Sequence, residues 1–285
     1  MKIIDVHTHG IGGFDTTSVL ENEILRIAEI HGNHGVSEII PTLYPSTIGV
    51  MRENMQTIKD AISLQERKGS KGANISGIHL EGPFLNPARC GSLNKDSFIA
   101  PGESSLKQLL EGFEDVVRIM TVSPELDGAP ALIKIISDMG IITSMGHSDA
   151  TYSEAEEGFN SGARGITHIF NAMRGIHHRE PGIAGFGLMS KDIYIEVIAD
   201  PFHLAPKLIE FIFSAKDQDR IIIISDTVKD TKTEAVSDGI MDGEGRLMGG
   251  SLTVNESAER LIKAGINKDA VMRAISANPV RYLLT

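Results

Sequence analysis

Residues 221–226 read Ile-Ile-Ile-Ile-Ser-Asp, an unbroken aliphatic run that ends on a hydroxyl and a carboxylate. Four consecutive aliphatic side chains leave no polar face, so a strand here must be buried on both sides, as in a parallel sheet covered by helices. A half-exposed antiparallel strand would alternate apolar and polar residues instead. The stretch therefore predicts a buried parallel strand in an α/β fold.

Similar runs recur along the chain and are separated by segments of helical period. The candidate strands lie at residues 3–7, 38–42, 75–81, 116–122, 141–145, 164–168, 193–199 and 221–225. Between strands, residues 18–30 and 206–213 place apolar side chains three and four positions apart, which is typical of helices that pack on a sheet. This alternation predicts a (β/α)8 TIM barrel, formed as a single domain over residues 1–285. A doubly wound open sheet is the main alternative, because strand counting from one sequence is accurate only to about one element.

The composition narrows the class of function. The 285 residues carry a net charge of -11, which opposes binding to nucleic acid or to an anionic membrane surface. No apolar run approaches the roughly 20 residues that cross a bilayer, and the first residues lack the pattern of a signal peptide. The single cysteine, Cys90, excludes a disulfide within the chain and fits a reducing cytosol. We therefore expect a cytoplasmic protein that acts on a small molecule.

Five of the expected strands end on side chains that can bind a metal ion. The candidates are His7 and His9, Glu81, His147, His168 and Asp226. In a barrel the carboxyl ends of the strands meet at one face, which is the face that carries catalysis. Imidazole and carboxylate groups together are the ligands of a divalent ion in an open catalytic site. The sequence thus predicts a metal-dependent hydrolase with one or two divalent ions, for which zinc is the first choice.

Each candidate also has a purely structural interpretation. Glu81 can be a surface acid, His147 a buried imidazole with internal partners, and Asp226 a helix cap. Agreement among five strand ends favours the metal site, and no serine-hydrolase elbow, C-x-x-C pair or dinucleotide fingerprint offers another chemistry. We assign Asp226 as the catalytic acid/base, because hydrolysis needs a carboxylate that moves a proton to the leaving group.

Two further histidines do not follow a strand. His31 and His34 stand beside Gly32 and Gly35, and this pattern predicts solvent-exposed residues past a helix end. We therefore leave both outside the candidate site.

Longer blocks of the sequence resemble a known family. They are HTH at 7–9, HLEGPF at 79–84, GHS at 146–148, THIFNAM at 167–173, HREPG at 178–182, IADPFH at 198–203, SD at 225–226, MGGSLT at 248–253 and ANP at 277–279. Over nearly the whole chain these blocks are similar to the N-acetylglucosamine-6-phosphate deacetylases of the amidohydrolase superfamily. The resemblance implies an enzyme of amino sugar metabolism that converts N-acetylglucosamine 6-phosphate to glucosamine 6-phosphate and acetate.

The resemblance also implies a role for each matching residue. Glu81, His147 and His168 would hold the principal metal, Asp226 would be the acid/base, and His7 and His9 would form a second metal position. The residues implied to bind the substrate are Asn171, Ala172, Arg179 and His203, with Met248 and Gly249 in a sugar-contacting loop. Similar proteins are homodimers, in which the arginine can reach across the interface.

Two features depart from the family. Relatives carry segments before the first strand and after the last helix that form a small β-sandwich, and we expect this subdomain to be absent. Where relatives have K-G-A-H, residues 90–93 read CGSL, so Leu93 stands in place of the substrate-binding histidine. Leucine forms no hydrogen bond with a sugar. Two alternatives therefore stay open: another amidohydrolase, such as a cyclic amidase or deaminase, and a non-catalytic sugar-phosphate binding protein.

Overall fold

A ring of parallel strands forms the centre of the protein, seen in a computed structural model that describes residues 1–69, 71–232 and 238–285. Within these residues eight strands follow one another in the order β1, β4, β6, β7, β8, β9, β10 and β11. Their bounds are Ile4–Thr8, Glu38–Leu43, Ile78–Glu81, Val117–Val122, Ile142–Met145, Gly165–Ile166, Tyr194–Ile198 and Ile221–Ile224. Toward their carboxyl ends, β1 and β11 are joined where Asp226 N donates to His7 O at 2.9 Å and His9 N donates to Thr227 O at 2.7 Å. The structure confirms the predicted (β/α)8 barrel, and the alternative of a doubly wound open sheet is wrong.

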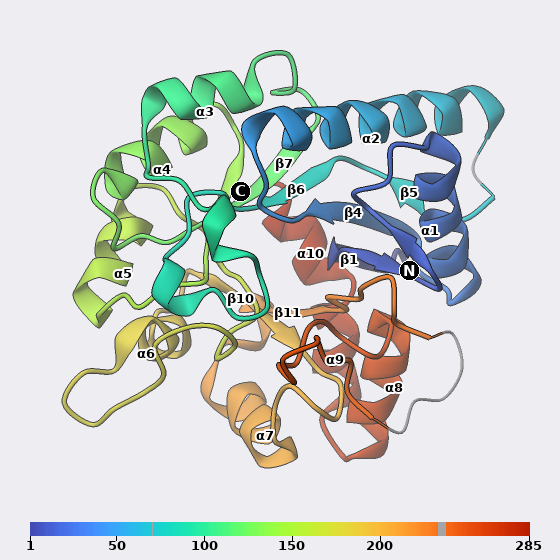
Figure 1. Cartoon of the computed structure of the whole chain (residues 1–285). Helices are drawn as coiled ribbons and strands as arrows, with labels where there is room; N and C mark the ends of the chain where they lie inside the picture. The colour runs from blue at the N-terminus through green and yellow to red at the C-terminus, as the bar shows by residue number, and fades with distance from the viewer. Residues whose placement is uncertain (70, 233–237) are drawn as a thin grey trace.

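Helices surround this ring, and Figure 1 labels them in chain order. Their bounds are α1 Glu21–Asn33, α2 Ile48–Lys68, α3 Glu103–Leu110, α4 Ala129–Asp138, α5 Tyr152–Asn160, α6 Gly182–Met189, α7 Pro206–Ala215, α8 Val254–Lys263, α9 Lys268–Ala274 and α10 Ala277–Tyr282. Shorter elements are the β2–β3 hairpin (Gly10–Ile11 and Phe14–Asp15), β5 (Asn74–Ile75) beside β4, and the 3-10 turns η1 Pro87–Arg89, η2 Lys95–Ser97 and η3 Gln218–Arg220. Among the described residues, none of these helices has the length and apolar character needed to span a membrane.

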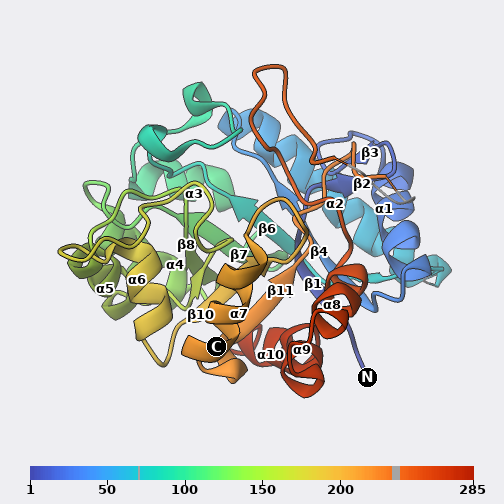
Figure 2. The ribbon, with the colours of Figure 1, turned by 90° about the horizontal axis from the view of Figure 1, so that it is seen from below.

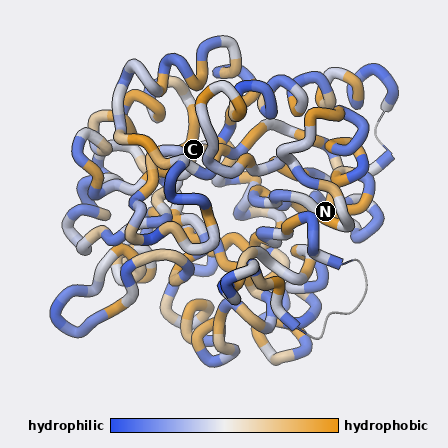
Figure 3. Tube along the Cα trace, in the orientation of Figure 1, coloured by the Kyte–Doolittle hydropathy of each residue, from blue (hydrophilic) through white to orange (hydrophobic). Residues whose placement is uncertain are grey.

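The apolar core has two layers, and only one of them lies inside the barrel. The outer layer joins the strands to the helices, and Figure 3 shows hydrophobic segments gathered toward the centre with hydrophilic turns outside. The inner layer consists of Ile4, Val6, Ile40, Ile119, Ile142, Tyr194, Ile198, Ile222, Ile224 and Tyr282. Tyr282 belongs to α10, so this helix covers the amino ends of the strands. The polar inward positions lie toward the opposite end, where the loop after β11 rises away from α9 and α10 in Figure 2.

A β-bulge in β1 turns its last residues toward the barrel interior. Ile4 and Val6 belong to the inner layer, so regular alternation would send His7 outward. The pairing of β1 with β4 shifts register between Asp5 and Thr8, and such a bulge re-aims the side chains that follow it. His7 and His9 consequently face inward together, while Thr8 faces α1.

His31 corrects one prediction from the sequence. It is fully buried rather than exposed, because α1 continues to Asn33. Its Nε2 lies 3.1 Å from Thr8 Oγ1, and its Nδ1 lies 3.9 Å from Asp5 Oδ2. Gly32, which suggested a helix end, serves close packing instead, since a Cβ there would lie 2.5 Å from the Cα of Gly72.

The buried His31 predicts a loss of stability in acid. Burial, and to a smaller extent the charge of His34, lower the pKa of His31 from 6.5 to about 3. At pH values below the pKa of His31 in the unfolded chain, the unfolded chain binds a proton at this histidine and the folded chain does not. The free energy of unfolding therefore decreases as the pH falls from the unfolded pKa toward the folded one. We expect His31→Gln, which cannot take up this proton, to lessen that dependence by up to about 1.4 kcal/mol per pH unit between about pH 6 and pH 4. Urea unfolding of both proteins at several pH values measures the slopes, and equal slopes would contradict the prediction.

Candidate metal centre

The six predicted metal-binding and catalytic residues lie together at the carboxyl end of the barrel. They come from β1, from β6 and from the segments that directly follow β1, β8, β9 and β11. The residues are His7, His9, Glu81, His147, His168 and Asp226, none of them more than 6% exposed. The structure thus brings together side chains that are up to 219 positions apart in the sequence.

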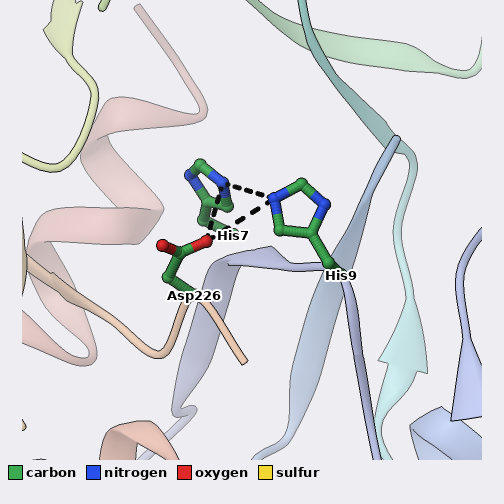
Figure 4. A group of neighbouring side chains, drawn as sticks. All are labelled: His7, His9 and Asp226. Atoms are coloured by element: carbon green, nitrogen blue, oxygen red, sulfur yellow. Dashed lines mark hydrogen bonds and ion pairs between the residues drawn. The ribbon is translucent and has the colours of Figure 1, made fainter. Parts of the chain in front are cut away.

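The first group consists of His7, His9 and Asp226 (Figure 4). The Nε2 atoms of the two histidines lie 3.2 Å apart. Asp226 Oδ1 lies 3.3 Å from His7 Nε2 and 3.5 Å from His9 Nε2, so that three possible ligand atoms converge. Asp226, predicted as an acid/base, is therefore placed equally well to bind an ion in the second metal position.

The second group consists of Glu81, His147 and His168. Glu81 Oε1 lies 3.1 Å from His147 Nε2 and 2.9 Å from His168 Nε2, and these two nitrogens are 3.2 Å apart. The other oxygen of this carboxylate, Oε2, lies 3.2 Å from His9 Nε2. Glu81 thus faces both groups, one oxygen toward each, and it could bridge two ions.

The backbone at several of these residues adopts a conformation that side chains usually avoid. The φ angle is +48° at His147, +30° at His168 and +50° at Asp226. A residue with a Cβ in this region costs of order 1 kcal/mol, and such residues concentrate at functional sites. The turns lie just past the ends of β8, β9 and β11, where they direct the side chains over the mouth of the barrel.

The charges of the site fit a cation. No lysine or arginine in the described residues forms an ion pair with Glu81, Asp226 or Glu196, and the histidines are their only basic partners. Burial raises the pKa of the Asp226 carboxyl well above its usual range, and the nearby Glu81 and Glu196 carboxylates add to this rise. Burial likewise lowers the pKa of His7 and that of His168, which favours neutral imidazoles with a free lone pair. Neutral imidazoles around buried carboxylates are the donor set of a divalent ion.

Glu81 differs from the other buried acids. Burial opposes its ionisation, but the charge of His147 and the hydrogen bonds with His147 and His168 outweigh burial and hold the pKa of Glu81 well below its usual range. A carboxylate that stays ionised between two groups of imidazoles is suited to bind metal ions on both sides.

Glu196 lies in contact with the candidate centre, and the sequence reasoning missed it. It is completely buried in the middle of β10, and its Oε2 lies 3.3 Å from Nδ1 of His7. A carboxylate on the far nitrogen of a metal-binding imidazole orients the ring and increases its basicity. The available signal was an acid inside an otherwise apolar strand, residues 194–198 YIEVI.

His79 was also left out, although it shares the inward face of β6 with Glu81. Its Nε2 lies 2.8 Å from Thr121 Oγ1 and its Nδ1 lies 3.3 Å from Thr42 Oγ1, so both ring nitrogens have protein partners. The ring packs edge-on against His7 with centroids 4.6 Å apart. His79 therefore supports the ring of His7 rather than offering a ligand atom.

A cavity of about 380 Å³ opens over the two groups. Of the predicted substrate residues, its lining includes Asn171, Ala172, His203 and Met248. Gly249 lies directly beneath, where a Cβ would come within 2.5 Å of the carbonyl oxygen of Asp226. The apolar part of the lining comes from Leu93, Ile198, Val228, Leu247 and Met248, together with Tyr44, whose ring stacks on His9 at 3.9 Å.

Arg179 is the one predicted substrate residue that the structure places away from this cavity. It is exposed, in the segment between β9 and α6, and its guanidinium contacts the neighbouring His178 at 3.0 Å. The cavity lining contains neither lysine nor arginine among the described residues. The described part of this chain therefore does not bring Arg179 to the cavity wall.

Known proteins match this chain over nearly its full length. The model of the amidohydrolase family matches residues 2–284. The N-acetylgalactosamine-6-phosphate deacetylase of Escherichia coli O157:H7 is 26% identical, and the alignment covers 98% of this chain and 76% of that protein. The N-acetylglucosamine-6-phosphate deacetylase of Bacillus subtilis (strain 168) is 30% identical, over 91% of this chain and 68% of the other.

Solved structures agree with these matches. The crystal structure of N-acetyl-D-glucosamine-6-phosphate deacetylase from Mycobacterium smegmatis has a TM-score of 0.87 and 29% identity, and covers 99% of this chain and 77% of its own. A mutant of that enzyme, solved in complex with N-acetyl-D-glucosamine-6-phosphate, has the same TM-score at 28% identity and the same coverage of both chains. The likeness therefore spans the whole barrel, including the segments that carry the candidate centre.

Proposed function

Since the chain belongs to the amidohydrolase family, we propose that it is a metal-dependent deacetylase that converts N-acetylglucosamine 6-phosphate to glucosamine 6-phosphate and acetate. The observation that carries this proposal is the convergence of Glu81, His147 and His168 beside Asp226 at the floor of the cavity. The related Mycobacterium smegmatis structure that holds N-acetyl-D-glucosamine-6-phosphate supports the choice of substrate.

In this proposal some residues of the centre bind an ion, and Asp226 transfers a proton. Glu81, His147 and His168 would hold the principal divalent ion, which we propose is zinc, and His7 and His9 would hold a second one. A bound ion of this kind polarises the acetyl carbonyl and lowers the pKa of a water molecule. Asp226 accepts the proton of the attacking water and donates it to the sugar nitrogen as the C–N bond breaks.

The residues that line the cavity affect which N-acyl compounds can bind there. Leu93 presents methyl groups where a histidine could bind a hydroxyl, and Leu247 and Met248 extend the apolar part of the wall. The relative from Escherichia coli O157:H7 is named for N-acetylgalactosamine 6-phosphate, which differs from the glucosamine compound only in the configuration of one hydroxyl group. We therefore keep another amide, including a cyclic one, as the second candidate substrate of the same metal site.

Acetate release is the direct test of this function. Protein loaded with zinc should release acetate from N-acetylglucosamine 6-phosphate, and chelation followed by dialysis should abolish the release until zinc is restored. The panel should include the galactosamine epimer, unphosphorylated N-acetylglucosamine and a cyclic amide. Turnover of the cyclic amide alone would overturn the substrate and keep the chemistry. No turnover of any compound, with sugar phosphate still bound, would favour a non-catalytic binding protein.

We further propose that the protein works as a cytoplasmic homodimer in which Arg179 reaches the substrate phosphate of the partner. An arginine fork forms two charge-assisted hydrogen bonds with a phosphate. Arg179→Ala should therefore raise KM for the 6-phosphate by about 10- to 100-fold and leave turnover of the unphosphorylated sugar unchanged. Arg67→Ala, an exposed arginine at the end of α2, is the matched control. Light scattering gives the oligomeric state, and a monomer with unchanged KM would contradict the prediction.

A further inference from the structure

Asp200 is a buried carboxylate just beyond β10 that lies outside the two groups of candidate ligands. It is 1% exposed, and in the part of the chain that the structure describes no lysine or arginine pairs with it. Five donors face its two oxygens instead. Oδ1 accepts the backbone N–H groups of Phe202 and His203, both at 2.9 Å. Oδ2 accepts the N–H of Ser251 at 3.0 Å and its hydroxyl at 3.1 Å, and lies 3.0 Å from His203 Nδ1.

These donors decide the orientation of His203. Burial opposes the charge on Asp200, but the hydrogen bonds from His203 and from the backbone hold the pKa of this carboxyl well below its usual range. An ionised carboxylate only accepts hydrogen bonds, so Nδ1 of His203 must carry a proton. The other ring nitrogen, Nε2, has no protein partner among the described residues, and His203 lines the cavity. The free nitrogen is therefore the one available to a ligand.

Ser251 connects the same carboxylate to a second part of the cavity wall. It closes the segment 248–251, whose first residue, Met248, lines the cavity. Gly250 N donates to Asp226 O at 2.7 Å, and a Cβ on Gly250 would lie 1.8 Å from the carbonyl oxygen of Ser225. The segment thus runs directly along the residues that follow β11. Through Asp200 it is joined to the loop after β10.

We propose that Asp200 is a positioning residue for substrate binding. One of its oxygens holds the ring of His203 with Nε2 free for an oxygen of the amino-sugar ligand, and the same oxygen ties the Met248 segment in place. Asp200 touches neither substrate nor metal ligands and acts through these two partners. The inference rests on the proposed function only for the identity of the substrate, because the hydrogen bonds at Asp200 exist without it.

The tautomer of His203 tests the proposal without any activity measurement. Zinc-loaded protein labelled with ¹⁵N at histidine should show His203 protonated at Nδ1, with its signals assigned by their absence in His203→Gln. Asp200→Asn offers a single acceptor oxygen to five donors, so its amide group must face some of them, and the weaker hold on the ring should increase the share of His203 protonated at Nε2. A wild-type spectrum with His203 protonated at Nε2 alone would overturn the proposal, even if Asp200→Asn failed to fold.

Steady-state kinetics supply the second readout. Asp200→Asn should raise KM for the sugar phosphate about tenfold and change kcat by less than about threefold, because Asp226 and the metal ligands are untouched. Asp217→Asn makes the same chemical change at an exposed carboxylate that accepts the backbone N–H of Asp219, and it should match wild type. Unchanged KM in Asp200→Asn would overturn the proposal. Failure of the wild-type protein to hydrolyse any N-acetyl sugar would instead refute the proposed function, and the spectra would still decide the role of Asp200.

Discussion

Replacing Glu81 with glutamine should empty both metal positions and lower kcat/KM for N-acetylglucosamine 6-phosphate by more than about 10³-fold. Glu81 Oε1 faces His147 and His168, while Oε2 faces His9. Glutamine preserves the shape but turns one of these oxygens into an NH₂ donor, which cannot bind an ion. It also removes the buried negative charge that compensates the cation.

Metal content and activity together check this prediction. Elemental analysis of protein dialysed against zinc should give less than one ion per chain for Glu81→Gln and at least one for wild type. Glu154→Gln is the matched control, because the capping box that Glu154 forms with Thr151 at the start of α5 also accepts glutamine. Full metal content in Glu81→Gln would show that this carboxylate is not a ligand.

Replacing Asp226 with asparagine should strongly lower turnover while the principal metal stays bound. Asparagine can fill the same space 3.3 Å from His7 Nε2, but it cannot accept a proton from water or return one to the sugar nitrogen. General acid/base catalysis contributes about 10²–10⁴-fold, so kcat should fall by a factor in this range. KM should stay within a few-fold of the wild-type value, since Asp226 acts on the reacting bond.

The metal content of Asp226→Asn separates two roles for this residue. The Glu81–His147–His168 group should keep its ion, so a loss of at most one ion per chain is expected. Calorimetry should show that the variant still binds the substrate. Activity within tenfold of wild type would refute the assignment of Asp226 as acid/base, whereas loss of all bound metal would show that Asp226 is needed for the whole centre.

The sequence alone was sufficient to predict most of this centre. His7, His147, His168 and Asp226 each occur at the end of a short apolar run, and strand ends of a barrel necessarily meet at one face. Glu81 was found for the same reason. The prediction failed at His31, because a glycine beside it resembled a helix end, and Glu196 was not considered although it is an acid inside an apolar strand.

Other features depended on contacts that local pattern does not encode. Glu196 and His7 are 189 positions apart, and only the order of strands around the ring brings β10 near β1. The bulge that turns His7 inward appears in the pairing of β1 with β4, not in the alternation of residues 4–8. The position of Arg179 outside the cavity lining likewise could not be predicted from its motif, and its contact with substrate stays a prediction.

The sequence by itself determined the barrel and which polar side chains gather at its mouth, because burial on both faces and polar strand ends are local properties of the chain. Only the tertiary structure decided how these side chains face one another: which group each oxygen of Glu81 serves, how Glu196 supports His7, and how Asp200 joins two loops of the cavity. These relations depend on strand register and on the closure of the ring, which arise from packing between segments far apart in the sequence.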